Sequence, residues 1–311
     1  MQVTFEENEK YRLFVNGLAN RIGVFDFGSD QLVWHYTDGP GFLGILQSAT
    51  LFATQVSSLN DPNETKYGTD LYKEVVKQVM AENASDAEAV AFFTGVLEAV
   101  KDDPDSPTHG TSKFFVTCFS ADENDLAQWR LYGGQNPYAI GFYARGLNRE
   151  PNSQLYKVIY NRDKQLAFVR EVVEATLRFY REGLTGDRLD NPAEWGRLFF
   201  NAWDEWVYKL APLAKDASWH TENEFRIVHE LKASEFPKVR FSQKKTVLAR
   251  YLPLETTTWV KRRAQLLPIA KIWIGPGERQ SFTKISVDLL LEQMGYFNVP
   301  VEVSKLCIVR P

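Results

Sequence analysis

Short apolar runs of strand length constrain the fold of this chain more than any other feature of its sequence. Such runs occupy residues 32–37, 114–119, 225–229 and 272–274. Patterns of helical period stand between some of them, but helices and strands do not alternate regularly. Regular alternation is typical of a parallel βαβ sheet, so its absence favours an α+β fold.

The length of the chain, 311 residues, suits one large domain or two of medium size. Hydrophobic residues make up 44% and aromatic residues 14% of the chain, which is ample material for a folded core. No internal repeat or low-complexity linker marks a boundary. We therefore predict a single domain over residues 1–311, with the helical stripes of residues 163–214 as an insertion within it.

Several features argue against membrane and metal sites. No apolar run approaches the roughly 20 residues of a membrane-spanning helix, and the first residues are acidic where a signal peptide is basic. Cys118 and Cys307 lie far apart in apolar runs, which favours reduced thiols, and two cysteines cannot form a zinc cage. The four histidines show no i,i+4 pairing. We expect a cytoplasmic protein without membrane contact and without a metal site.

The net charge of −4 hides a basic segment at residues 238–271, which holds nine lysines and arginines and one acid, Glu255. A positive surface attracts phosphates, whether in a nucleic acid or in a dinucleotide. The alternative is an ordinary solvated surface with scattered bases.

The expected strand at 32–37 carries His35 and Thr37 near its end, where Asp38-Gly39-Pro40 interrupts it and a helix over 40–48 begins. Ligand sites concentrate at such strand ends. The alternative is that His35 is a core histidine satisfied by a backbone partner.

Strand alternation places Glu222, Glu224 and Arg226 on one side of a second expected strand, opposite Phe225. An acid beside an arginine stays ionised, which suits a group that orients a hydroxyl or stabilises a cation. The alternative is a salt bridge between Glu224 and Arg226 that only supports the strand.

A short helix before Gly133 carries Gln128 and Arg130, side chains that could hold a phosphate or an amide. Trp129 between them is expected in the core.

Two resemblances add to these observations. The motif His35-x-Thr37 with Phe42-x-Gly44-Ile45-Leu46 resembles the first motif of ADP-ribosyltransferases of the poly(ADP-ribose) polymerase and DNA-targeting toxin type. From about residue 32 to the C-terminus, the chain is similar to a bacterial family known as a domain of unknown function. The motifs behind this second resemblance are Asn60-Asp61-Pro62-x-Glu64, Cys118-Phe119-Ser120, Gln128-Trp129-Arg130-x-Tyr132-Gly133, Glu222-x-Glu224-Phe225-Arg226 and Ile274-Gly275-Pro276.

The transferase resemblance implies a split, mixed β core with inserted helices and NAD as the substrate. It implies that His35 binds the adenosine-side ribose, that Thr37 holds the nicotinamide amide and that Tyr67 covers the nicotinamide ring. Glu224 would orient the nicotinamide-ribose hydroxyl and stabilise the oxocarbenium-like transition state. Tyr36 stands where the family usually has glycine, and no spacing rule selects Glu224 over Glu222.

We therefore expect an enzyme that cleaves the nicotinamide–ribose bond of NAD, either an ADP-ribosyltransferase or an NAD glycohydrolase. The acceptor of ADP-ribose would be water or a macromolecule, for example a nucleic acid drawn to residues 238–271. The alternative is a non-catalytic module that senses a nucleotide or a partner. In either case phage defence in bacteria is the setting that we expect.

Overall fold

The computed structural model describes residues 2–21, 28, 30–59, 63–100, 113–134, 136–147, 153–200, 211–243, 248–255 and 266–307, with the backbone alone at 19–21, 63–65 and 255. The chain divides into two compact units. The helical unit comprises Met1–Asp26, Gln55–Phe114 and Val158–Trp219, and the sheet unit comprises Phe27–Thr54, Phe115–Lys157 and His220–Pro311.

A mixed sheet of ten strands forms the core of the sheet unit. Its strands are β1 (Leu32–Thr37), β2 (Thr50–Gln55), β3 (Phe114–Ser120), β4 (Tyr138–Tyr143), β5 (Ser153–Lys157), β6 (Glu224–Glu230), β7 (Arg240–Gln243), β8 (Leu248–Glu255), β9 (Ile269–Ile274) and β10 (Val301–Val303). The main order is β10-β9-β4-β1-β3-β2-β8-β7, while β6 pairs with both β3 and β5. β9 and β10 run parallel, whereas β1 runs antiparallel to β3 and β4. The predicted α+β class is confirmed.

Side chains alternate between the two faces of this sheet, which fixes the residues that can meet. Val33 of β1 lies in the main hydrophobic cluster with Phe119 of β3 and Phe225 of β6. We call this side the His35 face, because His35 follows Val33 at an interval of two. Trp34 lies in a separate cluster on the other side, which we call the Trp34 face.

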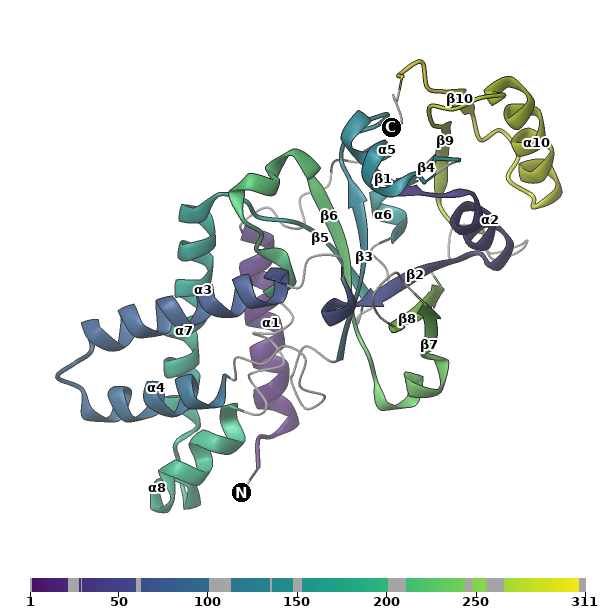
Figure 1. The fold of residues 1–311 in the computed structure, drawn as a ribbon. Helices are drawn as coiled ribbons and strands as arrows, with labels where there is room; N and C mark the ends of the chain where they lie inside the picture. Colours follow the sequence, from purple (N-terminus) through teal and green to yellow (C-terminus); the bar gives the residue numbers. More distant parts are fainter. Residues whose placement is uncertain are drawn as a thin grey trace. The chain divides into compact units, whose positions relative to one another are not determined.

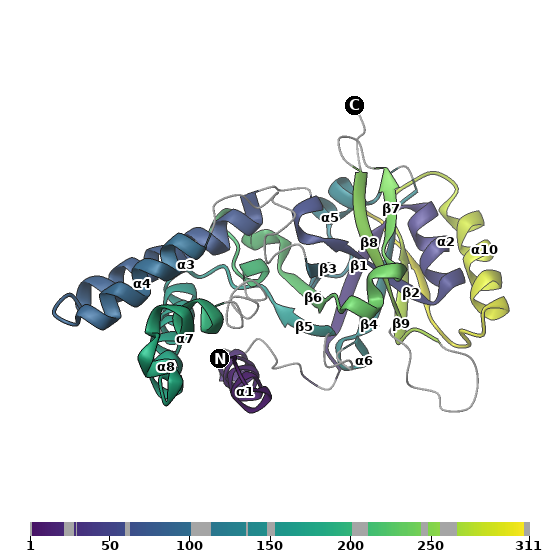
Figure 2. The same cartoon turned by 90° about the horizontal axis from the view of Figure 1, so that it is seen from below.

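Helices cover both faces of the sheet. The helices of this unit are α2 (Gly39–Ser48), α5 (Leu126–Tyr132), α6 (Ala144–Leu147), α10 (Gln280–Gln293) and the 3-10 helix η5 (Ala233–Lys238), and the 3-10 helix η4 (Ala217–Glu222) leads into β6. α2 and α10 lie side by side (Figures 1 and 2), and both bury apolar residues in the main cluster. α5 contributes Trp129 to the cluster on the Trp34 face.

The sequence explains why α2 begins directly after β1. Asp38 accepts a hydrogen bond from the backbone N–H of Gly41 at 2.8 Å and so caps the helix, while Pro40 fits its first turn. The helix ends where Ala49 takes the left-handed conformation, with φ of 51°. The strand end that carries His35 is therefore fixed by a capped helix.

The helical unit consists of helices that pack through apolar and aromatic faces. They are α1 (Phe5–Arg21), α3 (Asn63–Glu82), α4 (Ala87–Ala99), α7 (Arg162–Gly183), α8 (Asp187–Asp190) and the 3-10 helices η1 (Val56–Ser58) and η3 (Ala211–Leu213). α3 and α4 form a hairpin (Figure 1), and α7 packs against α3. The rings of Phe92 in α4 and Tyr180 in α7 stack with centroids 4.2 Å apart.

The block predicted as a helical insertion, residues 163–214, falls in this unit together with the N-terminal helix and residues 55–114. The organisation as a single domain stays a prediction. No helix in the described ranges is long and apolar enough to cross a membrane.

Candidate nucleotide-binding site

His35 is held against β3 by one of its two ring nitrogens. Nδ1 lies 2.9 Å from the carbonyl oxygen of Cys118, and the ring meets that of Phe119 edge-on with centroids 5.7 Å apart. A carbonyl oxygen can only accept, so Nδ1 carries the proton and donates it. Nδ1 is therefore satisfied by a backbone partner, as the alternative interpretation of His35 expects.

The other nitrogen, Nε2, is a hydrogen-bond acceptor. Burial lowers the pKa of His35 below its ordinary value of 6.5, and the hydrogen bond to Cys118 opposes this shift only in part. At neutral pH the ring is therefore uncharged, and with the proton on Nδ1 it has a lone pair on Nε2. No residue in the described part of the chain hydrogen-bonds to Nε2, and His35 remains partly exposed. A ligand hydroxyl or N–H could donate to it.

Thr37 lies on the same face, two residues further along β1. A Cβ atom at Gly41 would lie 2.1 Å from the Thr37 hydroxyl, so only glycine leaves room for this hydroxyl beside the first turn of α2. The hydroxyl makes no hydrogen bond to the residues whose placement is described. His35 and Thr37 thus present two polar groups roughly 7 Å apart along one strand.

Glu224 and Arg226 form a buried ion pair at the start of β6. The guanidinium donates from Nε to Oε1 at 2.8 Å and from Nη2 to Oε2 at 2.7 Å. Their side chains are only 7% and 2% exposed, respectively. Bidentate pairing of this kind fixes the orientation of both side chains. The sequence-based alternative of a pair between Glu224 and Arg226 is therefore present, but it is buried and not at the surface.

Strand alternation separates this pair from His35. Phe225 and Ile227 lie in the main hydrophobic cluster of the His35 face, so Glu224 and Arg226 point to the Trp34 face. The structure therefore does not bring the carboxylate of Glu224 to the face where His35 lies.

Glu222 is also buried, and the main chain around it connects β3 to β6. Its carbonyl oxygen accepts a hydrogen bond from the hydroxyl of Ser120 at 2.9 Å, and Asn223 accepts one from the N–H of Ala121 at 2.8 Å. These bonds join the end of one strand to the start of the next. The choice between Glu222 and Glu224 stays open.

Tyr67 belongs to the helical unit, in α3. Its hydroxyl donates to Oε1 of Gln165 at 2.8 Å, and Arg162 lies over its ring with the guanidinium carbon 5.9 Å from the centroid. Gln165 in turn donates to the carbonyl oxygen of Lys215 at 2.8 Å. The phenol is thus part of a polar network that ties α3 to α7, and its proposed role over a nicotinamide ring stays a prediction.

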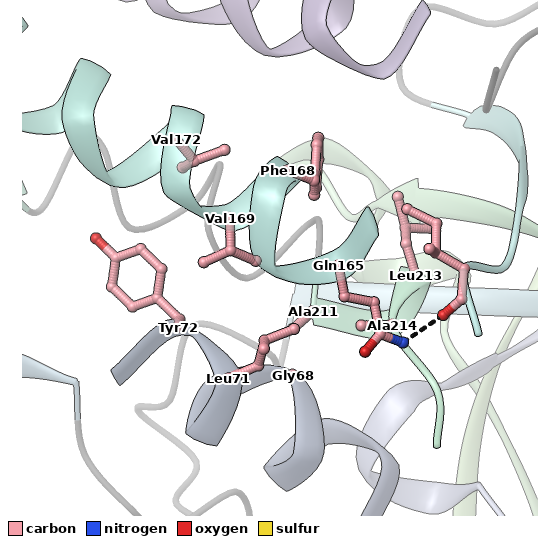
Figure 3. Close-up of a pocket in the computed structure, with 11 residues that line it drawn as sticks. Gly68, Leu71, Tyr72, Gln165, Phe168, Val169, Val172, Ala211, Leu213 and Ala214 are labelled. Carbon is pink, nitrogen blue, oxygen red and sulfur yellow. Dashed lines mark hydrogen bonds between the residues drawn. The ribbon is translucent and has the colours of Figure 1, made fainter. Parts of the chain in front are cut away.

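A small cavity lies beside this network, where Gly68 and Leu71 of α3 face Gln165 and Val169 of α7 (Figure 3). Its volume of about 30 Å³ is room for about one water molecule. The lining is mostly apolar, and the amide of Gln165 is its main polar group (Figure 3). A nucleotide does not fit there.

Gln128 and Arg130 occupy different sides of α5. Gln128 is buried, and its N–H donates to the capping carboxylate of Asp125 at 2.8 Å, whereas Arg130 is exposed. Trp129 is 1% exposed, and its indole N–H donates to Asn124. The core role expected for Trp129 is confirmed, and a ligand role for its two neighbours stays a prediction.

The Trp34 face has an open hollow of about 640 Å³ whose lining includes Trp34, Asp30, Asp122 and Glu123. Glu123 pairs with Lys271 at 3.2 Å, but Asp30 and Asp122 keep the lining negative, so the hollow does not suit a pyrophosphate. Nowhere in the described ranges do three or more histidine, cysteine or acidic side chains form a group that could hold a metal ion.

Sequence reasoning missed a chain of three polar side chains on the His35 face. The imidazole of His229 lies between Ser153, with Nδ1 2.6 Å from Oγ, and Glu235, with Nε2 3.1 Å from Oε2. Burial would raise the pKa of Glu235, but the N–H of Lys232 and the nearby imidazole outweigh it and lower that pKa. Ser153 and His229 are both buried, so this chain joins β5, β6 and η5. No motif signals it, because Glu235 lies in a separate 3-10 helix.

Comparison with known proteins adds one match. Residues 128–227 match a family model described as a protein of unknown function (DUF2971). The DUF2971 region runs from Gln128 in α5 to Ile227 in β6 and so includes the buried pair of Glu224 and Arg226, but not His35. No curated protein and no solved structure shows significant similarity to the chain.

Proposed function

We propose that the sheet unit binds NAD or a related nucleotide at the end of β1, with a ribose hydroxyl donating to Nε2 of His35. The observation that carries this proposal is the state of the ring: Nδ1–H is bound to the carbonyl of Cys118, and burial keeps the imidazole neutral. The acceptor is thereby preorganised, which lowers the entropic cost of binding. The resemblance of His35-x-Thr37 to the first motif of ADP-ribosyltransferases supports NAD in particular.

Cleavage of the nicotinamide–ribose bond is the activity that this resemblance suggests. Nicotinamide would leave C1′ with the bonding electrons, and water or an acceptor hydroxyl would bond to C1′ and lose a proton. A carboxylate near C1′ would stabilise the positive charge of the transition state. Glu224 pairs with Arg226, but it points to the other face of the sheet.

The second candidate is a non-catalytic module that senses a nucleotide, and the orientation of Glu224 favours it. In the described part of β6, the positions facing the same side as His35 are Phe225, Ile227 and His229, none of which is a carboxylate. Binding without cleavage is the result that this candidate predicts.

Calorimetric titration with NAD, followed by an assay for released nicotinamide, tests both candidates. His35→Asn keeps a donor for the carbonyl of Cys118 but removes the acceptor at Nε2. We expect it to weaken binding about tenfold, the effect of one hydrogen bond. His220→Ala, at an exposed histidine, is the control and should bind like the wild type.

The outcomes separate the candidates. Binding with nicotinamide release that Glu224→Gln abolishes favours the enzyme, and binding without release favours the sensing module. No binding of NAD, or equal binding by the wild type and His35→Asn, contradicts the proposal.

A further inference from the structure

α10 has two apolar sides, only one of which the fold uses. Val287 and Leu291 are buried in the main hydrophobic cluster. On the other side, Phe282, Ile285 and Leu289 are exposed by 70%, 61% and 63%. We call these three residues the outer stripe.

The spacing of the outer stripe is that of a helix-pairing seam. Its members follow one another at intervals of three and four residues, as the a and d positions of a coiled coil do. Single exposed apolar side chains are common on monomers, whereas three in line on one helix offer a partner a continuous apolar contact.

The charges at the two ends of the outer stripe indicate what covers it. Arg279 precedes the stripe, Glu292 follows it, and both are exposed. In an identical helix running antiparallel, Arg279 therefore lies opposite Glu292 at each end, whereas in a parallel copy Arg279 would lie opposite Arg279 and Glu292 opposite Glu292. The helix dipoles also favour the antiparallel arrangement.

We propose that the chain forms a symmetric dimer by antiparallel pairing of α10 with α10 of a second copy. A two-fold axis between Ile285 and Ser286 puts Phe282 opposite the partner's Leu289 and Arg279 opposite the partner's Glu292. The contact is isologous and closes on itself. Three side chains per copy fall well short of the roughly 800 Å² per partner of a standard interface, so the dimer is weak and depends on concentration.

Sedimentation velocity of the full chain over a range of concentrations tests this dimer. The wild type should shift from monomer to dimer as its concentration rises. Ile285→Asp should remain monomeric throughout, while Leu13→Asp, at a leucine of α1 that is 62% exposed, should dimerise like the wild type. Circular dichroism of each variant shows whether it is folded.

A charge exchange tests the antiparallel register. Arg279→Glu and Glu292→Arg should each weaken the dimer several-fold, and the chain with both changes should recover it.

In a Cys307→Ser background, Ile285→Cys should form a disulfide dimer on mild oxidation, because this residue lies next to the axis. A wild type that is monomeric at every concentration overturns the proposal, as does a dimer that these substitutions leave unchanged. A chain that stays monomeric but binds anionic vesicles through the outer stripe also overturns it.

Discussion

His35 uses one ring nitrogen to hold β1 against β3 and leaves the other as an acceptor. The tautomer follows from its partner, because the carbonyl of Cys118 cannot donate. The position of the ring is therefore fixed, while Nε2 keeps an acceptor lone pair that no described residue uses. This combination is the reason to place the ligand at His35 and not at the buried pair of Glu224 and Arg226.

Burial of His35 predicts a particular dependence of stability on pH. The pKa of His35 in the folded protein is below 6.5, its ordinary value, which the unfolded chain retains. Below pH 6.5 the unfolded chain therefore binds more protons than the folded protein, and the free energy of unfolding falls as the pH falls. Above pH 6.5 the histidine is neutral in both states, so its titration no longer changes the free energy of unfolding.

Urea unfolding at a series of pH values checks this prediction. The wild type should lose stability between pH 6.5 and the lower folded pKa, and His35→Asn should show a smaller loss over the same interval. Equal losses in the two proteins would show that His35 does not titrate as proposed.

The pair of Glu224 and Arg226 should matter for stability whether or not it acts on a ligand. Arg226→Met leaves a buried carboxylate without its bidentate partner, which costs about 3–5 kcal/mol. Adding Glu224→Leu removes the buried carboxylate that has lost this partner and should recover much of the loss. Denaturant midpoints of the single and double variants measure both effects. A double variant no more stable than Arg226→Met would contradict this explanation.

Sequence alternation predicted that Glu224 and Arg226 share one side of their strand and that Phe225 takes the other. It could not predict that His35 lies on the side of Phe225. Alternation fixes faces within one strand, whereas the relation between strands depends on how β1, β3 and β6 pair. The sequence also could not show what Nδ1 of His35 bonds to, because its partner, Cys118, lies 83 residues away and is brought near by strand pairing.

At the scale of elements, close contact between α3 and η3 depends on Gly68. A Cβ atom at this position would lie 2.5 Å from the carbonyl oxygen of Ala211 and 2.8 Å from its Cα. Both atoms are backbone and cannot move aside cheaply, so Gly68→Ala should destabilise the protein by about 1–3 kcal/mol.

Gly95 of α4 is the matched control for this substitution. Nothing lies within 4 Å of a Cβ built there, so Gly95→Ala should stabilise the helix by up to about 1 kcal/mol. Thermal unfolding of both variants measures the difference. Destabilisation of equal size at Gly68 and Gly95 would show that the close contact is not the cause.

The elements that sequence predicted best are those with strong internal patterns. β1 and β3 are apolar runs, and α2 is marked by its cap and proline, so their positions could be read directly. β7 and β8 fall in the segment that we described only as basic. All four residues of β7 are exposed, so no alternation reveals it, and its strand character comes from pairing with β8.

At the scale of the whole molecule, the proposed site predicts which of the two units a bound ligand protects. Hydrogen exchange in the presence of NAD should show increased protection in β1, at the start of α2 and in the adjoining part of β3. These segments surround His35 and belong to the sheet unit. Protection confined to α3 and α7 would place the ligand in the helical unit and contradict the proposal.

The nucleic-acid surface expected at residues 238–271 stays a prediction. Of its bases, Lys271 donates to Glu302 at 2.9 Å and lies 3.2 Å from Glu123, so its charge is compensated within the protein. Lys244, Lys245 and the bases at 261–263 lie outside the described residues.

Histidine ¹⁵N NMR tests the central claim most directly, since it reports the protonation of each ring nitrogen. Comparison with His35→Asn assigns the signals of His35. We predict a neutral ring with the proton on Nδ1 and an unprotonated Nε2 whose resonance shifts when NAD is added. A proton on Nε2 in the free protein, or an Nε2 resonance unchanged at saturating NAD, would contradict the account.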